Sequence, residues 1–259
     1  MRITIFPILF LLLTLLACDK NTEPTNFDYT YGKVQAVDKK LIQINYDTTI
    51  SWNLEYDQHN NLVKISKHFP DTTIDEVYSY DNQDRLIRVH SNGYREEKYT
   101  YEDDKLVQKR IIYSDVSSNW VEPNYKYFYN ELGQIIKAEG YAGDSLTSYF
   151  NYTYDNKGNV TNISEYAASG PRSLALTEKK MKYDNQPLPI KMPNISSVEI
   201  SQVNNVTYSH YFNVIMSSLP PEHRSVFEYD TDGYPLKEIR TRLIQGEEQG
   251  VQEIFYVYE

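Results

Sequence analysis

The chain contains few of the residues that common kinds of functional site require. Its 259 residues include a single cysteine, Cys18, so no disulfide can form within the chain. It has 26 Lys and Arg against 36 Asp and Glu, and the net charge of -10 argues against a general nucleic-acid surface, which needs clustered positive charge. The sequence has no Gly-rich phosphate loop and no Gly-x-Ser-x-Gly. The five histidines lack metal-binding spacing, so we expect no metal and no cofactor.

The longest apolar run lies at the N-terminus. After one basic residue, Arg2, the chain is almost wholly apolar from Ile3 to Ala17, as in a signal peptide. The run is shorter than the ~20 residues that a membrane-spanning helix needs, and Asp19 and Lys20 follow at once. A transmembrane anchor is therefore disfavoured.

The residues that end this run resemble a bacterial lipobox, Leu15-Leu16-Ala17-Cys18, in which cleavage precedes a cysteine that carries lipid. We predict a signal peptide over 1–17, a lipidated Cys18 with a tether over 18–26, and one β domain over 27–259. The alternative is an unmodified cysteine inside an ordinary signal peptide. The lipoprotein would be exported and held in the cell envelope by its lipid, and we expect the membrane to be the outer one.

One phrase recurs along the chain. It reads LEYDQHNNLVKIS, YSYDNQDRLIRVH, YFYNELGQIIKAE, YTYDNKGNVTNIS and FEYDTDGYPLKEI. An Asp or Asn follows the central tyrosine, which we call the anchor tyrosine, and a Gly, Asn or Asp that accepts positive φ stands four positions past it. Each phrase therefore predicts a β-hairpin. The predicted turn residues are Asp57, Asn60, Asp81, Asp84, Gly133, Asp155, Gly158, Asp230 and Gly233.

The repeats set the expected fold class. Their spacing fits two strands and two turns each, so we predict an all-β fold, a long antiparallel meander of about 14 to 17 strands that curls or closes into a barrel-like sheet. A shorter copy follows Lys98, and another after Met181 has Pro187 where the glycine would stand. Prolines make 185–224 an irregular insert, in which strands and one short helix both remain open.

Aliphatic residues stand six and nine positions past four of the anchor tyrosines, as in Leu62 and Ile65 after Tyr56. Because an odd spacing places two side chains on opposite faces of a regular strand, we expect apolar groups on both faces. A basic residue stands eight positions past, such as Lys64 or Lys137. We expect its stem to cover neighbouring tyrosine rings while its charge stays in water.

Tyrosine is unusually frequent, with 25 Tyr against 9 Phe and 2 Trp. Tyrosines spaced by two lie on one face of a strand, so strand pairing predicts an aromatic stripe on the concave side. If it is open, the stripe is a candidate binding surface for a glycan, peptide or envelope protein; if it is covered, it is core. Its members are Tyr78, Tyr80, Tyr99, Tyr101, Tyr125, Tyr127, Tyr129, Tyr152 and Tyr154.

Two resemblances follow from these motifs. The phrase Tyr-Asp-x-x-Gly-x-Leu-x-x-Ile resembles the YD repeat of RHS-type proteins, most closely at Tyr80-Asp81 with Arg85-Leu86, where Asp84 replaces the glycine. A lipobox followed by such hairpins is similar to an uncharacterised family of Bacteroidetes-type lipoproteins described as porin-like β proteins. The likeness covers roughly 29–259. It implies a β shell and brings no catalytic residues.

We predict a non-catalytic, lipid-anchored envelope protein that binds or scaffolds through its tyrosine-rich sheet. One alternative is an envelope hydrolase with an acidic pair, because sequence gives no distances between carboxylates. Another is a purely structural β shell. A membrane-spanning barrel is disfavoured, since the segment Tyr94–Tyr101 places charged residues on both of its faces and leaves no lipid-facing band.

Overall fold

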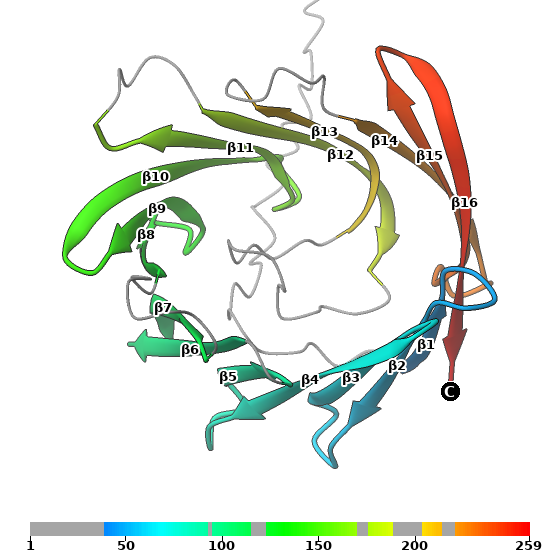
Figure 1. Cartoon of the computed structure of the whole chain (residues 1–259), viewed down its shortest axis with the longest axis horizontal. Coiled ribbons are helices and arrows are strands. Elements are labelled where there is room, and N and C mark those ends of the chain that lie inside the picture. The colour runs from blue at the N-terminus through cyan, green and yellow to red at the C-terminus, as the bar shows by residue number, and fades with distance from the viewer. Residues whose placement is uncertain (1–38, 93–94, 115–122, 170–175, 189–203, 214–220) are drawn as a thin grey trace, which may run out of the picture.

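A computed structural model of the chain describes residues 39–92, 95–114, 123–169, 176–188, 204–213 and 221–259. Its 16 strands pair antiparallel in chain order, and β1 pairs with β16, so the sheet closes into a barrel (Figure 1). The predicted all-β meander and its number of strands are confirmed, and the sheet is closed rather than merely curled. Cys18 and the proposed signal peptide and tether lie outside the described residues. No helix within the described ranges is long and apolar enough to span a membrane.

The strands are β1 Leu41–Asn45, β2 Ser51–Tyr56, β3 Leu62–Phe69, β4 Thr72–Tyr80, β5 Leu86–Ser91, β6 Arg95–Glu102, β7 Lys105–Tyr113, β8 Pro123–Tyr129, β9 Ile135–Ala142, β10 Ser145–Tyr154, β11 Val160–Ala167, β12 Thr177–Pro187, β13 Asn204–Asn213, β14 Glu222–Tyr229, β15 Pro235–Ile244 and β16 Glu247–Tyr258. The predicted insert thus contributes the end of β12, all of β13 and the start of β14, while 189–203 and 214–220 lie outside the described residues. Each recurring phrase spans the end of an even-numbered strand, a turn and the start of the next strand.

The turns follow from local hydrogen bonding. In the turn after β2, Asp57 Oδ1 accepts the backbone N–H groups of His59 and Asn61, both at 2.8 Å. The N–H of Asn60 donates to the carbonyl of Asp57 at 3.1 Å. Asp81, Asp155 and Asp230 accept backbone N–H groups in the same way. The residues that close these turns have positive φ, namely Asn60 at 64°, Asp84 at 58°, Gly133 at 78°, Gly158 at 86° and Gly233 at 88°.

A β-bulge beside each turn corrects the expected facing of the aliphatic residues. Tyr56 pairs with Leu62 and Glu55 pairs with Lys64, so Val63 is an extra residue in β3. The same shift recurs in the hairpins that follow β4, β6, β8, β10 and β14. Since the extra residue changes the alternation, positions six and nine face the same way, and Leu62 and Ile65 are both fully buried. The prediction that positions six and nine lie on opposite faces is wrong for this reason, although the outer face does carry apolar side chains such as Val226 and Ile136.

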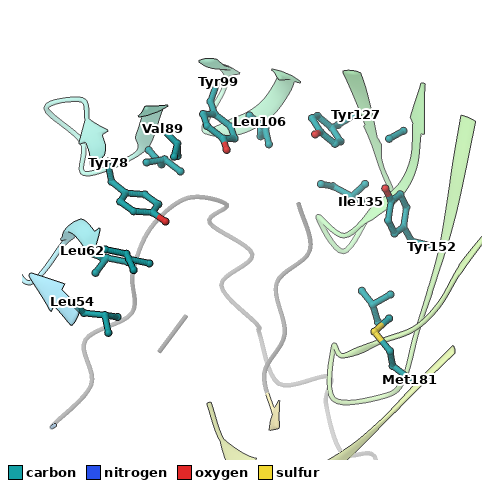
Figure 2. Close-up of a cluster of buried hydrophobic side chains, with 14 of the residues drawn as sticks. Leu54, Leu62, Tyr78, Val89, Tyr99, Leu106, Tyr127, Ile135, Tyr152 and Met181 are labelled. Atoms are coloured by element: carbon teal, nitrogen blue, oxygen red, sulfur yellow. The ribbon is translucent and has the colours of Figure 1, made fainter. Parts of the chain in front are cut away.

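The inward face of the barrel carries the core. Figure 2 shows side chains from successive strands, including Leu62, Tyr78, Tyr99, Tyr127 and Tyr152, directed toward the inside of the ring. Partly buried rings such as Tyr46 and Trp52, whose centroids lie 5.0 Å apart, pack against this layer. The apolar core is therefore a lining of the wall.

Candidate functional site

The anchor tyrosines form a hydrogen-bonded ladder around the barrel, together with Tyr101 and Tyr183 of the two variant copies and Tyr258 at the end of β16. Each hydroxyl donates to the backbone carbonyl of the residue that precedes the bulge in the neighbouring hairpin. The pairs are Tyr56 to Leu41 at 2.8 Å, Tyr80 to Leu62 at 2.7 Å, Tyr101 to Leu86 at 2.8 Å, Tyr129 to Leu106 at 2.7 Å, Tyr154 to Ile135 at 2.7 Å, Tyr183 to Val160 at 2.6 Å and Tyr258 to Pro235 at 2.8 Å. The ladder departs from this pattern at Tyr229, whose hydroxyl donates to the carboxylate of Asp184 instead.

The structure places the predicted tyrosine stripe in the barrel lining. Tyr78, Tyr99, Tyr127 and Tyr152 are buried, at 3 to 7% exposed. The other members, Tyr80, Tyr101, Tyr125, Tyr129 and Tyr154, are partly buried against the same core. Burial raises the pKa of Tyr80 well above the ordinary value of a tyrosine. It does the same for the pKa of Tyr183, which holds the equivalent place on β12. These rings are part of the core or pack against it.

A cavity of about 340 Å³ lies against the inward faces of β12 to β16, the strands that include the break in the ladder. Polar side chains occupy wall positions that are aliphatic elsewhere. Glu238 stands nine positions past its anchor tyrosine, where Ile65 and Ala138 stand in other repeats, and it lines the cavity. Met181, Val206 and other apolar residues complete the wall. The volume is in the range typical of small-molecule sites.

Glu238 is the most strongly held group in this cavity. It is 2% exposed, and its Oε1 accepts bonds from Ser225 Oγ at 2.6 Å and Arg240 Nε at 2.8 Å. Its Oε2 accepts bonds from Arg240 Nη2 at 3.0 Å and Tyr256 OH at 2.7 Å. A buried carboxylate with a bidentate guanidinium and two hydroxyl donors is neutralised and saturated. It is therefore a poor candidate for a general base or a cation ligand.

Two other cavity residues have unused polar capacity. Burial alone lowers the pKa of Lys179, and within the described ranges no carboxylate forms an ion pair with it. The Nδ1 atom of His223 is buried and has no hydrogen-bond partner among the described residues. Burial, followed by the charges of Arg240 and Arg242, lowers the pKa of His223. The imidazole is therefore neutral at pH 7.

Ion pairs join neighbouring strands on the outward face of the wall. Lys64 Nζ lies 3.1 Å from Asp75 Oδ2, Arg88 Nε lies 2.6 Å from Glu96 Oε1, and Lys237 Nζ lies 2.7 Å from Glu253 Oε1. The expected covering of aromatic rings by basic residues is also seen, at Lys137 over Phe128 and Tyr149, and at Lys237 over Phe255. Charges at these mid-strand positions are unfavourable in a lipid-facing band.

An aromatic group on the outer wall was missed by the sequence reasoning. The rings of Tyr149 and Tyr166 stack on β10 and β11, with centroids 5.2 Å apart and planes 11° apart. Tyr141 donates to Glu139 at 2.7 Å on the adjoining strand, and Phe128 is 41% exposed. Cross-strand pairing of 149 with 166 could be read from the sequence only once the hairpin register was known.

The described residues contain no group of three or more His, Cys, Asp or Glu side chains placed to hold a metal ion. The cavity residues Lys179, His223, Glu238 and Arg240 were not predicted. One signal for them does exist in the sequence, since Glu238 interrupts the aliphatic series at position nine of the repeat. Lys179 and His223 fall in the least regular repeats and carry no comparable signal.

Comparison with known proteins bears on the fold. No family model and no curated protein matches the chain. The structure of a porin-like protein from Bacteroides uniformis matches with a TM-score of 0.55 and 12% sequence identity, over 85% of this chain and 96% of that one. A porin-like protein from Bacteroides vulgatus matches with a TM-score of 0.51 and 11% identity, over 86% of this chain and 99% of that one. The chain is thus similar in fold to porin-like proteins, which confirms that part of the resemblance seen in the sequence.

Proposed function

We propose that the protein is a non-catalytic, lipid-anchored protein of the cell envelope that binds a small polar solute inside its barrel. The single observation that carries this proposal is the cavity against β12 to β16, with its volume of about 340 Å³ and its buried polar wall. The rest of the described lining is mostly apolar, apart from a buried charged group in which Lys109 Nζ lies 2.9 Å from Glu97 Oε2. The space beside that group is only about 10 Å³, so the cavity against β12 to β16 is the better candidate for holding a solute.

The proposed location combines Cys18 with the outer wall. Its ion pairs favour a barrel that stands in water, and the lipobox-like sequence supplies the attachment to a membrane. A similarity to porin-like proteins supports the same envelope setting. The absence of catalysis is supported by Glu238, whose oxygens are all engaged, so that the cavity offers no free acidic pair for hydrolysis.

The cavity proposal is tested by filling the space. We would replace Ser209, which lines the cavity, by Phe, and replace the exposed outer-wall residue Thr100 by Phe as the matched control. Saturation-transfer NMR against a mixture of monosaccharides, amino acids and small organic acids should show transfer with the wild type and Thr100→Phe, and none with Ser209→Phe. Equal transfer with both variants would place binding elsewhere.

A second candidate function rests on the outer wall. The stacked Tyr149 and Tyr166, with Phe128 and Lys137 beside them, form a planar aromatic surface on β8 to β11 that a glycan or peptide could cover. This moves the predicted tyrosine-rich binding surface from the inside of the wall to the outside. Tyr166→Ala should abolish glycan or peptide binding here while leaving transfer to the cavity intact.

A further inference from the structure

The charge inside the cavity indicates what kind of solute it takes. The carboxylate of Glu238 is neutralised by Arg240, so no carboxylate of the described residues compensates the ammonium of Lys179. Asp184, near the end of β12, accepts the N–H of Asn205 and the hydroxyl of Tyr229. On the adjoining strand β11, the inward carboxylate of Glu165 accepts the hydroxyl of Thr177 at 2.9 Å. Neither forms an ion pair with Lys179 among the described residues.

An unpaired ammonium on a partly buried side chain that lines a cavity is unfavourable for an isolated fold. Desolvation disfavours its charged form, and the lowered pKa of Lys179 has that cause. A lysine retained at such a position gains stability when an anion enters and forms a charge-assisted hydrogen bond with it. The cavity is therefore complementary to one negative charge.

A second donor lies across the sheet. Ser209 of β13 pairs with Met181 on one side and with His223 on the other, so β12, β13 and β14 present these side chains in one row. The neutral imidazole of His223 carries one N–H, and the ring has an unsatisfied buried nitrogen. Ser209, which stands between Met181 and His223 in this row, adds a hydroxyl to the cavity wall. A carboxylate, which has two acceptor oxygens, matches this set of donors.

The remaining wall is apolar and restricts the rest of the solute. Met181, Val206 and Phe227 line the cavity beside the donors. Resting on the proposed function of the cavity, we infer that the solute is a small organic monocarboxylate, with its carboxylate bound by Lys179 and His223 and its body against this apolar wall. Arg240 is held by Glu238 and serves as a fixed part of the frame.

The test uses the full chain and three probes of similar size: benzoate, its uncharged planar counterpart benzamide, and the cation benzylamine. Calorimetric titration should show benzoate binding to the wild type, with benzamide at least about tenfold weaker and benzylamine silent. Lys179→Met should weaken benzoate binding by about ten- to a hundredfold and leave benzamide binding unchanged. The control is Lys180→Met, since Lys180 is exposed on the opposite face and pairs with Glu178.

The outcomes separate the two proposals. If benzamide binds as well as benzoate, the carboxylate inference is wrong and solute binding in the cavity stands. If neither binds while an uncharged solute of the mixture, such as a monosaccharide, still receives saturation from the wild type, the inference is likewise overturned alone. Lys179→Met should also melt at a higher temperature than the wild type without probe, because it removes an unpaired charge. A lower melting temperature would show that Lys179 has a structural partner and would overturn the inference.

Discussion

At the scale of single residues, the anchor tyrosines explain why this chain is so rich in tyrosine. A phenylalanine would fill the same space in the lining, but it could not donate to the carbonyl beside the bulge. That carbonyl would then lose a hydrogen-bond partner at the site where the bulge disturbs the regular ladder of the sheet. The hydroxyl of Tyr129, 2.7 Å from the carbonyl of Leu106, is representative.

Tyr129→Phe is expected to lower the free energy of unfolding by about 0.5 to 1.5 kcal/mol, the usual net value of one such hydrogen bond. Denaturant unfolding measures it. The control is Tyr166→Phe, since that outer-wall hydroxyl forms no hydrogen bond within the described part of the chain. Equal losses in the two variants would mean that the ladder does not stabilise the barrel.

The turn aspartates predict how stability depends on pH. Burial acts to raise the pKa of Asp57, but hydrogen bonds from Asn61 and His59 outweigh it and hold that pKa below its ordinary value. A carboxylate with a depressed folded pKa stabilises the fold above its unfolded pKa of about 3.9, and this contribution is lost as the pH falls through the folded value. Asn130 occupies the same place in another turn and accepts the N–H of Gln134 at 2.9 Å.

Asp57→Asn should therefore fold, should be less stable than the wild type at pH 7, and should approach the wild type as the pH falls below about 4. Urea unfolding over pH 2 to 7 follows the difference. A stability gap that stays constant over that range would contradict the assignment of Asp57 as a titrating turn acceptor.

At the scale of elements, the hairpin is the unit that the sequence specifies. Its turns were predictable because Asp, Asn and Gly have a local backbone reason to stand where they do. The bulges were not, because an extra residue such as Val63 carries no special chemistry and is recognised only from the pairing of Tyr56 with Leu62. The facing of positions six and nine depended on this one residue.

Deletion of the bulge residue Ile136, which is 41% exposed, should cost ~4 kcal/mol or more or prevent folding. Without it, the alternation would turn Lys137 inward and the fully buried Ala138 outward. Ile136→Ala keeps the extra residue and should change stability by less than about 1 kcal/mol. Thermal melting of both variants decides, and two similar melting temperatures would show that the bulge does not set the register.

At the scale of the whole molecule, the repeat predicts a meander, but closure depends on the two ends meeting. Backbone hydrogen bonds between Lys40 and Glu259, at 3.2 and 3.0 Å, join the start of the first strand to the end of the last. The cavity could not be predicted at all, because it needs five neighbouring strands to be placed before Lys179, His223 and Glu238 meet. The repeated turn pattern predicts the wall of the barrel, and the cavity lies at the strands where that pattern is least regular.

The attachment to a membrane is also a property of the whole chain. We expect a labelled fatty acid to be incorporated into the wild type and lost in Cys18→Ser, because Cys18 is the chain's single cysteine. The variant should leave the membrane fraction and melt at the same temperature as the barrel of the wild type. Retention of label by Cys18→Ser would show that the lipid is carried elsewhere, and a wild type that takes up no label would show that the chain is not lipidated.

The central claim, that the barrel binds a solute in the cavity against β12 to β16, is tested most directly at Met181, which lines that cavity. The chain has only 4 methionines, so a methyl-labelled methionine spectrum is simple, and Met181→Leu identifies its signal. We predict that the Met181 methyl resonance shifts progressively to saturation as benzoate is added, and that Lys179→Met reduces the shift. A Met181 signal that stays unmoved while the protein binds benzoate would contradict the account.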